Sequence, residues 1–341
     1  MKQKSIMGGL DIAKFLGALL IVSIHTRPLL VCGKEIDYYS SDVFCRIAVA
    51  FFFMCSGYFT FTKIQYDNNG KIENSNKNRK QLIKSEIRII TLYIMWSIIY
   101  FIVKLLQWMS VKEISFIHFL IAFGISFFIY GSYYHFWYML ALIYGIPIIY
   151  YLSLKINKKK LLIIGSGLYL VHLVINWNSV CPESKIISLI SRINIFPGAL
   201  SSTIFIGIPF MIWGGCFQVF QHKSKKVWLF FSIIGLYLEA RVLLHRFNIT
   251  SLNYIIFTVC VTVLIFQVFY EMKLSGNQYK WFRNLSTVIY CVHPLWITLL
   301  KKNGMANDTI LLFITTIILS FLSSVALILL SKKFVFIKNM Y

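Results

Sequence analysis

The chain has 341 residues, of which 58% are hydrophobic and only 13% are charged, and its mean hydropathy is +0.72. A soluble globular domain usually has about a quarter of its residues charged. Many apolar runs here approach or exceed the roughly 20 residues needed to cross a bilayer. The composition therefore excludes a soluble protein and predicts an all-α, polytopic membrane helical bundle, with the lipid bilayer as its surroundings.

The net charge of +22 would suggest a nucleic-acid partner if the protein were soluble. Here the basic residues lie mainly in loops between apolar runs, as the positive-inside rule expects, so we expect no nucleic-acid partner. The seven cysteines are scattered and show no CxxC or CxxH spacing, which predicts no metal site.

Charge placement in the loops predicts the topology. The most basic loops are expected to be cytoplasmic, together with Lys2 and Lys4 at the N-terminus. Satisfying all of these assignments gives about 10 transmembrane helices and places both termini in the cytoplasm. The predicted crossings are 10–31, 43–62, 88–108, 136–154, 161–176, 199–220, 227–244, 253–271, 284–300 and 309–331.

One apolar segment does not fit this count. Reading 114–130 as a full crossing would place the lysines at 158–160 outside, so we predict a re-entrant or interfacial helix there. A bundle with 11 crossings is the alternative. The whole chain, 1–341, is predicted to form one membrane domain, with a polar cytoplasmic loop near 63–88. The Asn-rich part of that loop, 66–80, is expected to be flexible.

The first apolar run, LDIAKFLGALLIVSIHTRPLL, contains Lys14 and His25 eleven residues apart. On a helix this spacing is a rise of about 16 Å and places both side chains on nearly the same face. Ionisable groups in a membrane helix are costly, so both residues are functional candidates. The structural alternatives are a lysine that extends to the inner interface and a histidine that caps or packs near the outer one.

Two later spans also contain ionisable residues. Glu239 needs a partner, which is either a salt bridge at the interface or a catalytic histidine on another helix that Glu239 orients. His293 precedes Pro294, so it either bonds a carbonyl that the proline leaves free or lines a polar cavity with Tyr290 as a substrate-binding residue.

The remaining candidates are residues that could bind a substrate, specifically a molecule that accepts a transferred group. His135 and Trp137 lie in the aromatic stretch GSYYHFWYMLALIYG, which predicts either an interfacial aromatic belt or a surface on which a sugar or lipid-linked acceptor stacks. Arg192 precedes the next span and either binds an acceptor phosphate or anchors its loop.

Lys14 and His25, followed by Ser56 and Tyr58 in FFFMCSGYF, resemble the signature of the membrane acyltransferase-3 family: Arg or Lys, ten residues, His, and then a Ser-Gly-Phe/Tyr element. The resemblance extends over most of the chain, and several of its motifs look closest to the membrane half of the vancomycin-resistance serine racemases, which belongs to the same family. The further matching motifs are HFWYMLAL, SRINIF, GLYLEARVLLH and LSTVIYCVHPLW.

The resemblance implies acetyl transfer from acetyl-CoA to a hydroxyl of a cell-envelope glycan or related acceptor, in a bacterial plasma membrane. His25 would act in proton transfer with Glu239 as a second catalytic residue. Lys14, Ser56 and Tyr58 would bind the donor. Many members have Arg where this chain has Lys14, and Lys keeps the charge but lacks the two-pronged contact with a phosphate.

A permease-like protein that moves a small solute such as serine is the alternative function, because a buried His and Glu also suit proton-coupled transport. The sequence ends at Tyr341 with no soluble racemase-like or hydrolase-like domain after the membrane part. This favours a glycan-modifying acyltransferase over half of a racemase. The acceptor, the acyl chain length and the oligomeric state are left open by the sequence.

Overall fold

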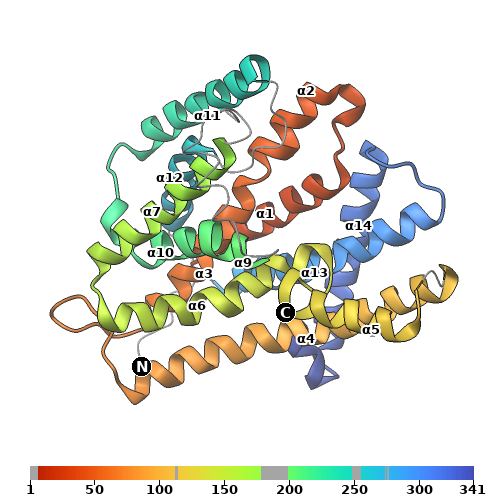
Figure 1. Ribbon diagram of the computed structural model, residues 1–341, viewed down its shortest axis with the longest axis horizontal. Helices are drawn as coiled ribbons and strands as arrows, with labels where there is room; N and C mark the ends of the chain where they lie inside the picture. The colour runs from red at the N-terminus through yellow and green to blue at the C-terminus, as the bar shows by residue number, and fades with distance from the viewer. Residues whose placement is uncertain (1–6, 112–113, 178–198, 248–254, 273, 275) are drawn as a thin grey trace. The chain divides into compact units, whose positions relative to one another are not determined.

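The computed structural model describes residues 7–111, 114–177, 199–247, 255–272, 274 and 276–341 (Figure 1). Within these residues the secondary structure is helical, with one isolated β-bridge between Tyr66 and Ile72, so the all-α prediction is confirmed. The principal helices are α1 (Gly8–Thr26), α2 (Lys34–Asp37), α3 (Ile47–Phe61), α4 (Asn76–Val111), α5 (Phe116–Ile125), α6 (Trp137–Lys155), α7 (Lys158–Trp177), α9 (Ala199–Ser202), α10 (Ile208–Gly215), α11 (Lys225–Phe247), α12 (Ile256–Tyr270), α13 (Gln278–Lys302) and α14 (Ile310–Leu330).

Short 3-10 or π segments connect several of these helices. They are η1 (Leu30–Cys32), η2 (Tyr38–Phe44), η3 (Ser126–Tyr130), η4 (Tyr134–Phe136), η5 (Thr203–Gly207), η6 (Phe217–Phe220) and η7 (Val335–Met340).

Each of the ten predicted crossings coincides with a helix, either a single one or, for 199–220, a run of short segments. Six helical stretches among the described residues are long and apolar enough to cross a membrane, and two further apolar helices are shorter. The protein is therefore a multi-pass helical membrane protein. The count of ten crossings and the cytoplasmic position of the termini stay predictions.

The chain divides into two compact units. Unit 1 comprises Met1–Cys55, Phe217–Asn339 and Tyr341, and unit 2 comprises Ser56–Cys216 and Met340. Unit 1 therefore contains α1, α2, α11, α12, α13 and α14, whereas unit 2 contains α4 to α10. Whether the two act as the one predicted domain stays a prediction.

The first helix is shorter than predicted at its C-terminal end. The apolar run suggested a span of 10–31, but α1 ends at Thr26 because Arg27 adopts a left-handed conformation with φ 45° and ψ 56°. Arg27 precedes Pro28, and a residue before proline is disfavoured in the helical region. His25 therefore lies in the last turn of α1, at one end of the helix and not deep within the span.

The segment expected to be an outer loop, 32–42, is largely helical. From Lys34 the chain runs through α2 and η2 toward α3, and the stretch Lys34–Phe61 meets the criterion for a membrane span as a whole. The sequence predicted a loop here because 32–42 lies between the first two predicted crossings. Asp37 and Asp42 are buried and form ion pairs with arginines, which allows the helical segment to continue through them.

The predicted polar loop near 63–88 is also more ordered than expected. Helix α4 begins at Asn76, so the second half of the loop is its first turns. Asn78 is buried and its side chain donates to the carbonyls of Gln65 and Glu73 and accepts from the Gln65 amide, at 2.8 to 2.9 Å. Asp67 accepts two further backbone amides. These side-chain bonds hold a polar segment in one conformation.

The segment 114–130 forms α5 and η3, ten and five residues long. Together they rise about 22 Å, which is less than the roughly 30 Å of a bilayer core. Gly131, at φ 99°, separates them from the next turn. A re-entrant or interfacial segment stays the prediction.

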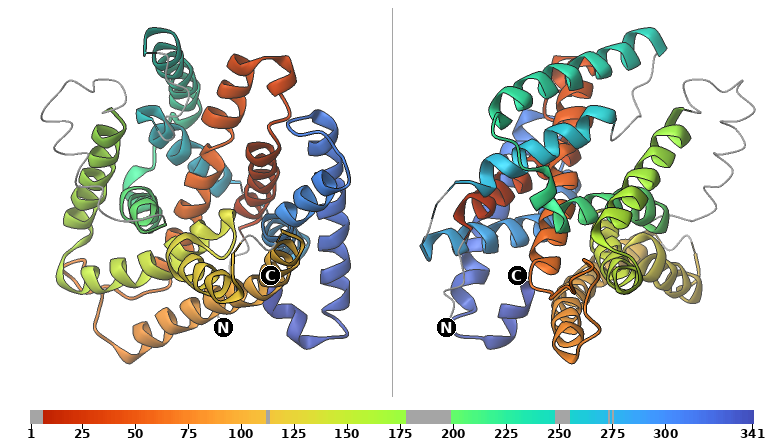
Figure 2. Two further views of the ribbon diagram at one scale, coloured as in Figure 1. Left: turned by 45° about the vertical axis from the view of Figure 1, so that its right-hand side comes forward. Right: turned by 90° about the vertical axis from the view of Figure 1, so that its left-hand side faces the viewer.

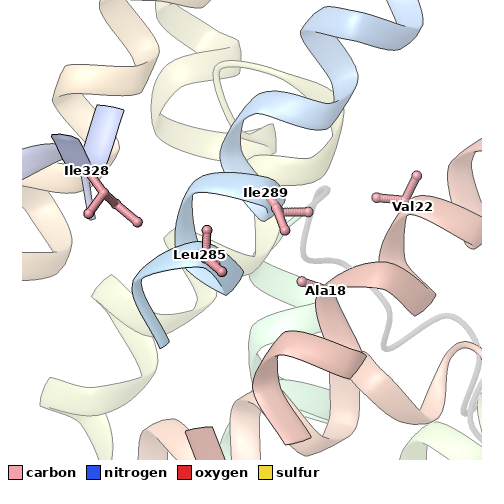
Figure 3. Close-up of a cluster of buried hydrophobic side chains, with 5 residues drawn as sticks. All are labelled: Ala18, Val22, Leu285, Ile289 and Ile328. Carbon is pink, nitrogen blue, oxygen red and sulfur yellow. The ribbon is translucent and has the colours of Figure 1, made fainter. Parts of the chain in front are cut away.

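Helices α1 and α13 pack side by side within unit 1 and run in the same direction. The Phe15 and Phe282 rings lie 5.4 Å apart, and the pairing advances along both helices together. Figure 3 shows Ala18 and Val22 of α1 facing Leu285 and Ile289 of α13, with Ile328 of α14 completing the buried cluster. The small side chain of Ala18 allows this close approach, whereas Gly17 faces Phe52 and Ala48 of α3.

The other contacts of unit 1 support this pair. Helices α13 and α14 form an antiparallel hairpin, drawn in blue in Figure 2, and α14 also contacts α1. Helices α11 and α12 pack against each other, and α12 contacts α1. The α1–α13 pair is thus held from two sides by apolar contacts, so its register fixes which polar residues meet.

Candidate functional site

The α1–α13 register brings two predicted site residues together. The imidazole rings of His25 and His293 are stacked, with centroids 5.3 Å apart and planes 24° apart. His293 is fully buried and His25 is half-buried. Both were predicted from the sequence, but as parts of different functions, a catalytic base and a substrate contact. Their stacking is a tertiary contact that neither motif predicts.

The backbone sets the tautomer of His293. Its Nδ1 lies 3.0 Å from the carbonyl oxygen of Ile289, one turn earlier on α13. A carbonyl oxygen only accepts, so Nδ1 carries the hydrogen and Nε2 is the nitrogen able to accept a proton. Pro294, inside the same helix, has no N–H to donate to the carbonyl of Tyr290, four residues earlier. The bonded carbonyl is that of Ile289, so the bond to the carbonyl that proline leaves free stays a prediction. The bond to Ile289 orients the ring of His293 against His25.

The N-terminal ends of α1 and α13, called the inner end after the predicted topology, also carry charged residues. Asp11 on α1 is buried, and the charges of both Lys14 and Arg283 act on its carboxylate. Arg283 belongs to α13 and Lys14 to α1. The electrostatic effect of Lys14 and Asp11 also reaches the buried thiol of Cys55 on α3. The predicted donor-binding Lys14 therefore shares its surroundings with a second cation.

An ionic network lies beyond the C-terminal end of α1, which is called the outer end after the predicted topology. Arg27 Nε donates to Asp37 at 2.6 Å and its terminal nitrogen to Asp42 at 2.7 Å, while Arg46 donates to Asp42 at 3.1 Å. Ser41 donates to the second oxygen of Asp37. Burial disfavours the charged guanidinium, but the hydrogen bonds and charges of the two aspartates raise the pKa of Arg27 above its ordinary value.

This network has a local and a functional consequence. It holds Arg27 in the left-handed conformation, which is uncommon for a residue other than glycine. The charge of Arg46 also acts on His25. We infer that the network fixes the last turn of α1 and thereby the position of the His25 ring.

Glu239 has a structural role that the sequence did not predict. Its two carboxylate oxygens accept the backbone amides of Ile256 and Phe257, both at 2.9 Å. These are the first two residues of α12, whose amides have no partner within the helix. Glu239 thus caps α12 from α11, and its predicted role as a catalytic carboxylate stays a prediction.

The other predicted residues belong to unit 2. Ser56 Oγ lies 3.0 Å from the hydroxyl of Tyr138, and Tyr58 is buried beside Phe59. A Cβ on Gly57 would lie 2.0 Å from the carbonyl oxygen of Met211, so this glycine is required for the approach of α3 to α10. The SGY element is therefore explained in part by helix packing, and its role in donor binding stays a prediction.

The aromatic stretch is a packed cluster in the structure. His135 is buried, and its ring lies 3.9 to 5.9 Å from those of Phe136, Tyr100, Tyr134 and Tyr133. Trp137 begins α6. Arg192 lies outside the described residues, and the acceptor roles predicted for all three stay predictions. No group of three or more potential metal-ligating residues lies together within the described part of the chain.

The sequence reasoning missed the residues that surround Lys14 and His25. Asp37 and Asp42 were assigned to a loop, and Arg46 and Arg283 were not singled out. A signal for Arg283 was present, because it precedes His293 by ten residues as Lys14 precedes His25 by eleven. The two arginines of the outer network, Arg27 and Arg46, leave no comparable pattern.

Comparison with known proteins decides the family. The pattern that defines a family of acyltransferase domains (Acyl_transf_3) matches residues 7–330. This chain belongs to the acyltransferase-3 family. Every candidate residue named above lies inside the matched range, so the acyltransferase-3 assignment covers both ends of the α1–α13 pair.

Three curated relatives resemble the chain. An amino-acid racemase from Enterococcus faecalis is 27% identical over 95% of this chain and 46% of its own length. A serine/alanine racemase from Enterococcus gallinarum is 25% identical over 92% of this chain and 44% of its own length. A second amino-acid racemase from E. faecalis is 32% identical over 48% of this chain and 21% of its own length. This acyltransferase-3 chain thus spans less than half the length of each of these three relatives. No solved structure matches it significantly.

Proposed function

We propose that this membrane acyltransferase transfers an acetyl group from acetyl-CoA to a hydroxyl of a cell-envelope glycan or related acceptor, in the plasma membrane of a bacterium. The observation that carries the proposal is the α1–α13 pair. One end of it presents Lys14 and Arg283, and the other end presents the stacked His25 and His293. A cationic end and an imidazole end suit an anionic, elongated donor with a reactive group at its far end.

The chemistry follows from the two ends. His25 takes the proton of the acceptor hydroxyl while its oxygen attacks the thioester carbonyl. The carbon–sulfur bond then breaks, the acyl group stays on the acceptor oxygen, and the thiolate of coenzyme A takes up the proton. His293, with Nδ1 bonded to Ile289, presents a defined ring face to His25 and orients it. Acetyl-CoA is a substrate here, and no metal is needed for these steps.

The distance between the ends supports this donor. Lys14 and His25 are separated by a helical rise of about 16 Å. The extended pantetheine arm of coenzyme A has a comparable reach. Phosphates held at Lys14 by charge-assisted bonds would therefore leave the thioester near the histidines. We propose that Ser56 and Tyr58 also contribute to donor binding, and that Glu239 acts indirectly, through the position of α12.

The acceptor part of the proposal rests on composition. We propose that His135, Trp137 and Arg192 bind the acceptor, the rings by stacking on a sugar and the guanidinium by pairing with a phosphate, as in a lipid-linked sugar. The aromatic surroundings of His135 support a stacking surface in that part of unit 2.

The proposal is tested by release of free thiol from acetyl-CoA. Purified protein in nanodiscs is supplied with crude envelope glycans, and wild type is compared with His25→Ala. We expect acceptor-dependent thiol release from wild type that falls at least roughly 100-fold in the variant, while coenzyme A binding is retained. Full activity of His25→Ala would refute the role of the histidine.

A permease for a small solute such as serine is the second candidate. It is favoured by the names of two relatives, an amino-acid racemase and a serine/alanine racemase, and by two histidines within membrane helices. Donor dependence separates the two. A permease should neither bind nor consume acetyl-CoA, and it should accumulate radiolabelled serine in proteoliposomes in a way that depends on a proton gradient.

A further inference from the structure

Helix α13 repeats the order of charged residues found on α1. Lys14 precedes His25 by eleven residues on α1, and Arg283 precedes His293 by ten on α13. The corresponding rises are about 16 Å and about 15 Å. Because the two helices are parallel, the cations meet at one end and the histidines at the other. The family signature on α1 thus has a counterpart on its neighbour.

The cationic end has an unusual balance of charge and hydrogen bonds. Two cations, Lys14 and Arg283, one from each helix, act electrostatically on the carboxylate of Asp11. The Nε of Arg283 and the Oδ1 of Asp11 are both buried, and neither has a hydrogen-bond partner. Arg46 Nε is unbonded in the same way, but the guanidinium of Arg46 already donates to Asp42. The Nε of Arg283 can donate a hydrogen bond to an anionic ligand oxygen.

We infer that Arg283 is a second binding residue for the phosphates of the acyl donor, acting beside Lys14. This rests on the proposed function and assigns to Arg283 what Lys14 cannot supply. A lysine is a point charge, whereas a guanidinium presents a fork that matches two phosphate oxygens. The diphosphate of coenzyme A therefore has one cation on each helix. Asp11 keeps the two cations from repelling each other while the site is empty.

This arrangement explains how the donor is aligned. With its phosphates bound to both α1 and α13, the pantetheine arm follows the contact between the helices toward the histidine pair. Lys14 and Arg283 then determine the affinity for the phosphate-bearing part of the donor. Substituting either residue should leave the affinity for the pantetheine arm unchanged. A purely structural Arg283 would affect both ligands through the fold.

The test measures the affinity of two ligands for the full-length protein in nanodiscs by isothermal titration calorimetry. One is coenzyme A, and the other is pantetheine, which lacks the phosphates. For Arg283→Gln we expect coenzyme A to bind about tenfold more weakly and pantetheine to bind as it does to wild type. Lys280→Gln is the matched control, because Lys280 is exposed on the same helix and contacts Asn277. It should change neither affinity more than about twofold.

The outcomes separate the two proposals. Unchanged coenzyme A affinity in folded Arg283→Gln overturns the inference and leaves the acyltransferase proposal intact. A wild-type protein that binds no coenzyme A overturns both. If Arg283→Gln does not fold, Arg283→Lys decides: a roughly threefold loss for coenzyme A alone supports the two-pronged contact, and wild-type affinity refutes it.

Discussion

The two ends of α1 are both ionic, but they differ in how their charged side chains are bonded. At the outer end Arg27 and Arg46 face Asp37 and Asp42, and hydrogen bonds of 2.6 to 3.1 Å join them, although the Nε of Arg46 is buried without a bond. At the inner end Lys14 and Arg283 act electrostatically on Asp11, and the Nε of Arg283 and the Oδ1 of Asp11 are buried without a hydrogen bond.

This difference suggests a division of work along one helix. A balanced, bonded network contributes to structure, and at the outer end it holds the turn that carries His25. Two neighbouring cations, one with a guanidinium nitrogen that has no hydrogen bond, are stabilised when an anion binds. The outer end should therefore govern stability and the geometry of His25, and the inner end should govern donor affinity.

The largest effect, a loss of acyl-transfer rate, is expected at the histidine pair. The outer network supports this pair by fixing the turn that carries His25. His293→Ala removes the ring against which His25 is stacked and should lower the rate of acceptor-dependent thiol release roughly 100-fold, with coenzyme A affinity unchanged. His118→Ala, an exposed histidine on α5, is the control. A loss of coenzyme A affinity equal to the loss of rate would place His293 in donor binding instead.

Breaking the outer network should affect stability. Asp37→Asn removes the negative charge that neutralises Arg27 and weakens the hydrogen bond between the two side chains. We expect the free energy of unfolding to fall by about 1.5 to 3 kcal/mol. Thermal unfolding in nanodiscs measures it, with Glu35→Gln as the control, because Glu35 is exposed and pairs only with exposed His245. If Asp37→Asn left the stability unaltered and weakened coenzyme A binding, the outer end would be the one that governs donor affinity, contrary to our assignment.

At the inner end, Lys14→Gln should weaken coenzyme A binding about tenfold and leave turnover of bound donor close to wild type. Lys14→Arg keeps the charge and should retain most of the affinity. Titration of both variants with coenzyme A and with pantetheine measures this. Equal weakening for the two ligands would mean that Lys14 supports the fold and does not recognise phosphate.

The smallest effect is expected at a closed ion pair elsewhere in unit 1. Glu271 pairs with Lys225 and accepts from Gln267, and these contacts lower the pKa of Glu271 below its usual value of 4.5. A lowered folded-state pKa stabilises the protein above pH 4.5, and this contribution is lost as the pH falls through the lower folded-state value. Glu271→Gln should thus have a slightly lower Tm at pH 6, and the difference should vanish once the pH falls below the lowered folded-state pKa of Glu271. A difference that persists in acid would show that the side chain acts through packing.

The sequence predicted the helical fold well because membrane helices need long apolar runs, and such runs are visible without tertiary information. It was less accurate at helix ends. The predicted outer loop at 32–42 became helical once Asp37 and Asp42 found arginine partners, and 66–80 became ordered through Asn78. Both outcomes depend on contacts between residues that no local pattern connects.

The chain by itself thus determined the membrane helices, the family signature on α1 and the candidate pair Lys14 and His25, since each is a matter of composition or of spacing along one helix. Only the tertiary structure decided that α13 runs parallel to α1 and in register with it, which placed His293 on His25 and Arg283 beside Asp11. It also decided that Glu239 caps α12. These pairings depend on which apolar faces fit together, as Ala18 and Val22 fit Leu285 and Ile289, and that fit is a property of two helices, which the sequence of either one does not contain.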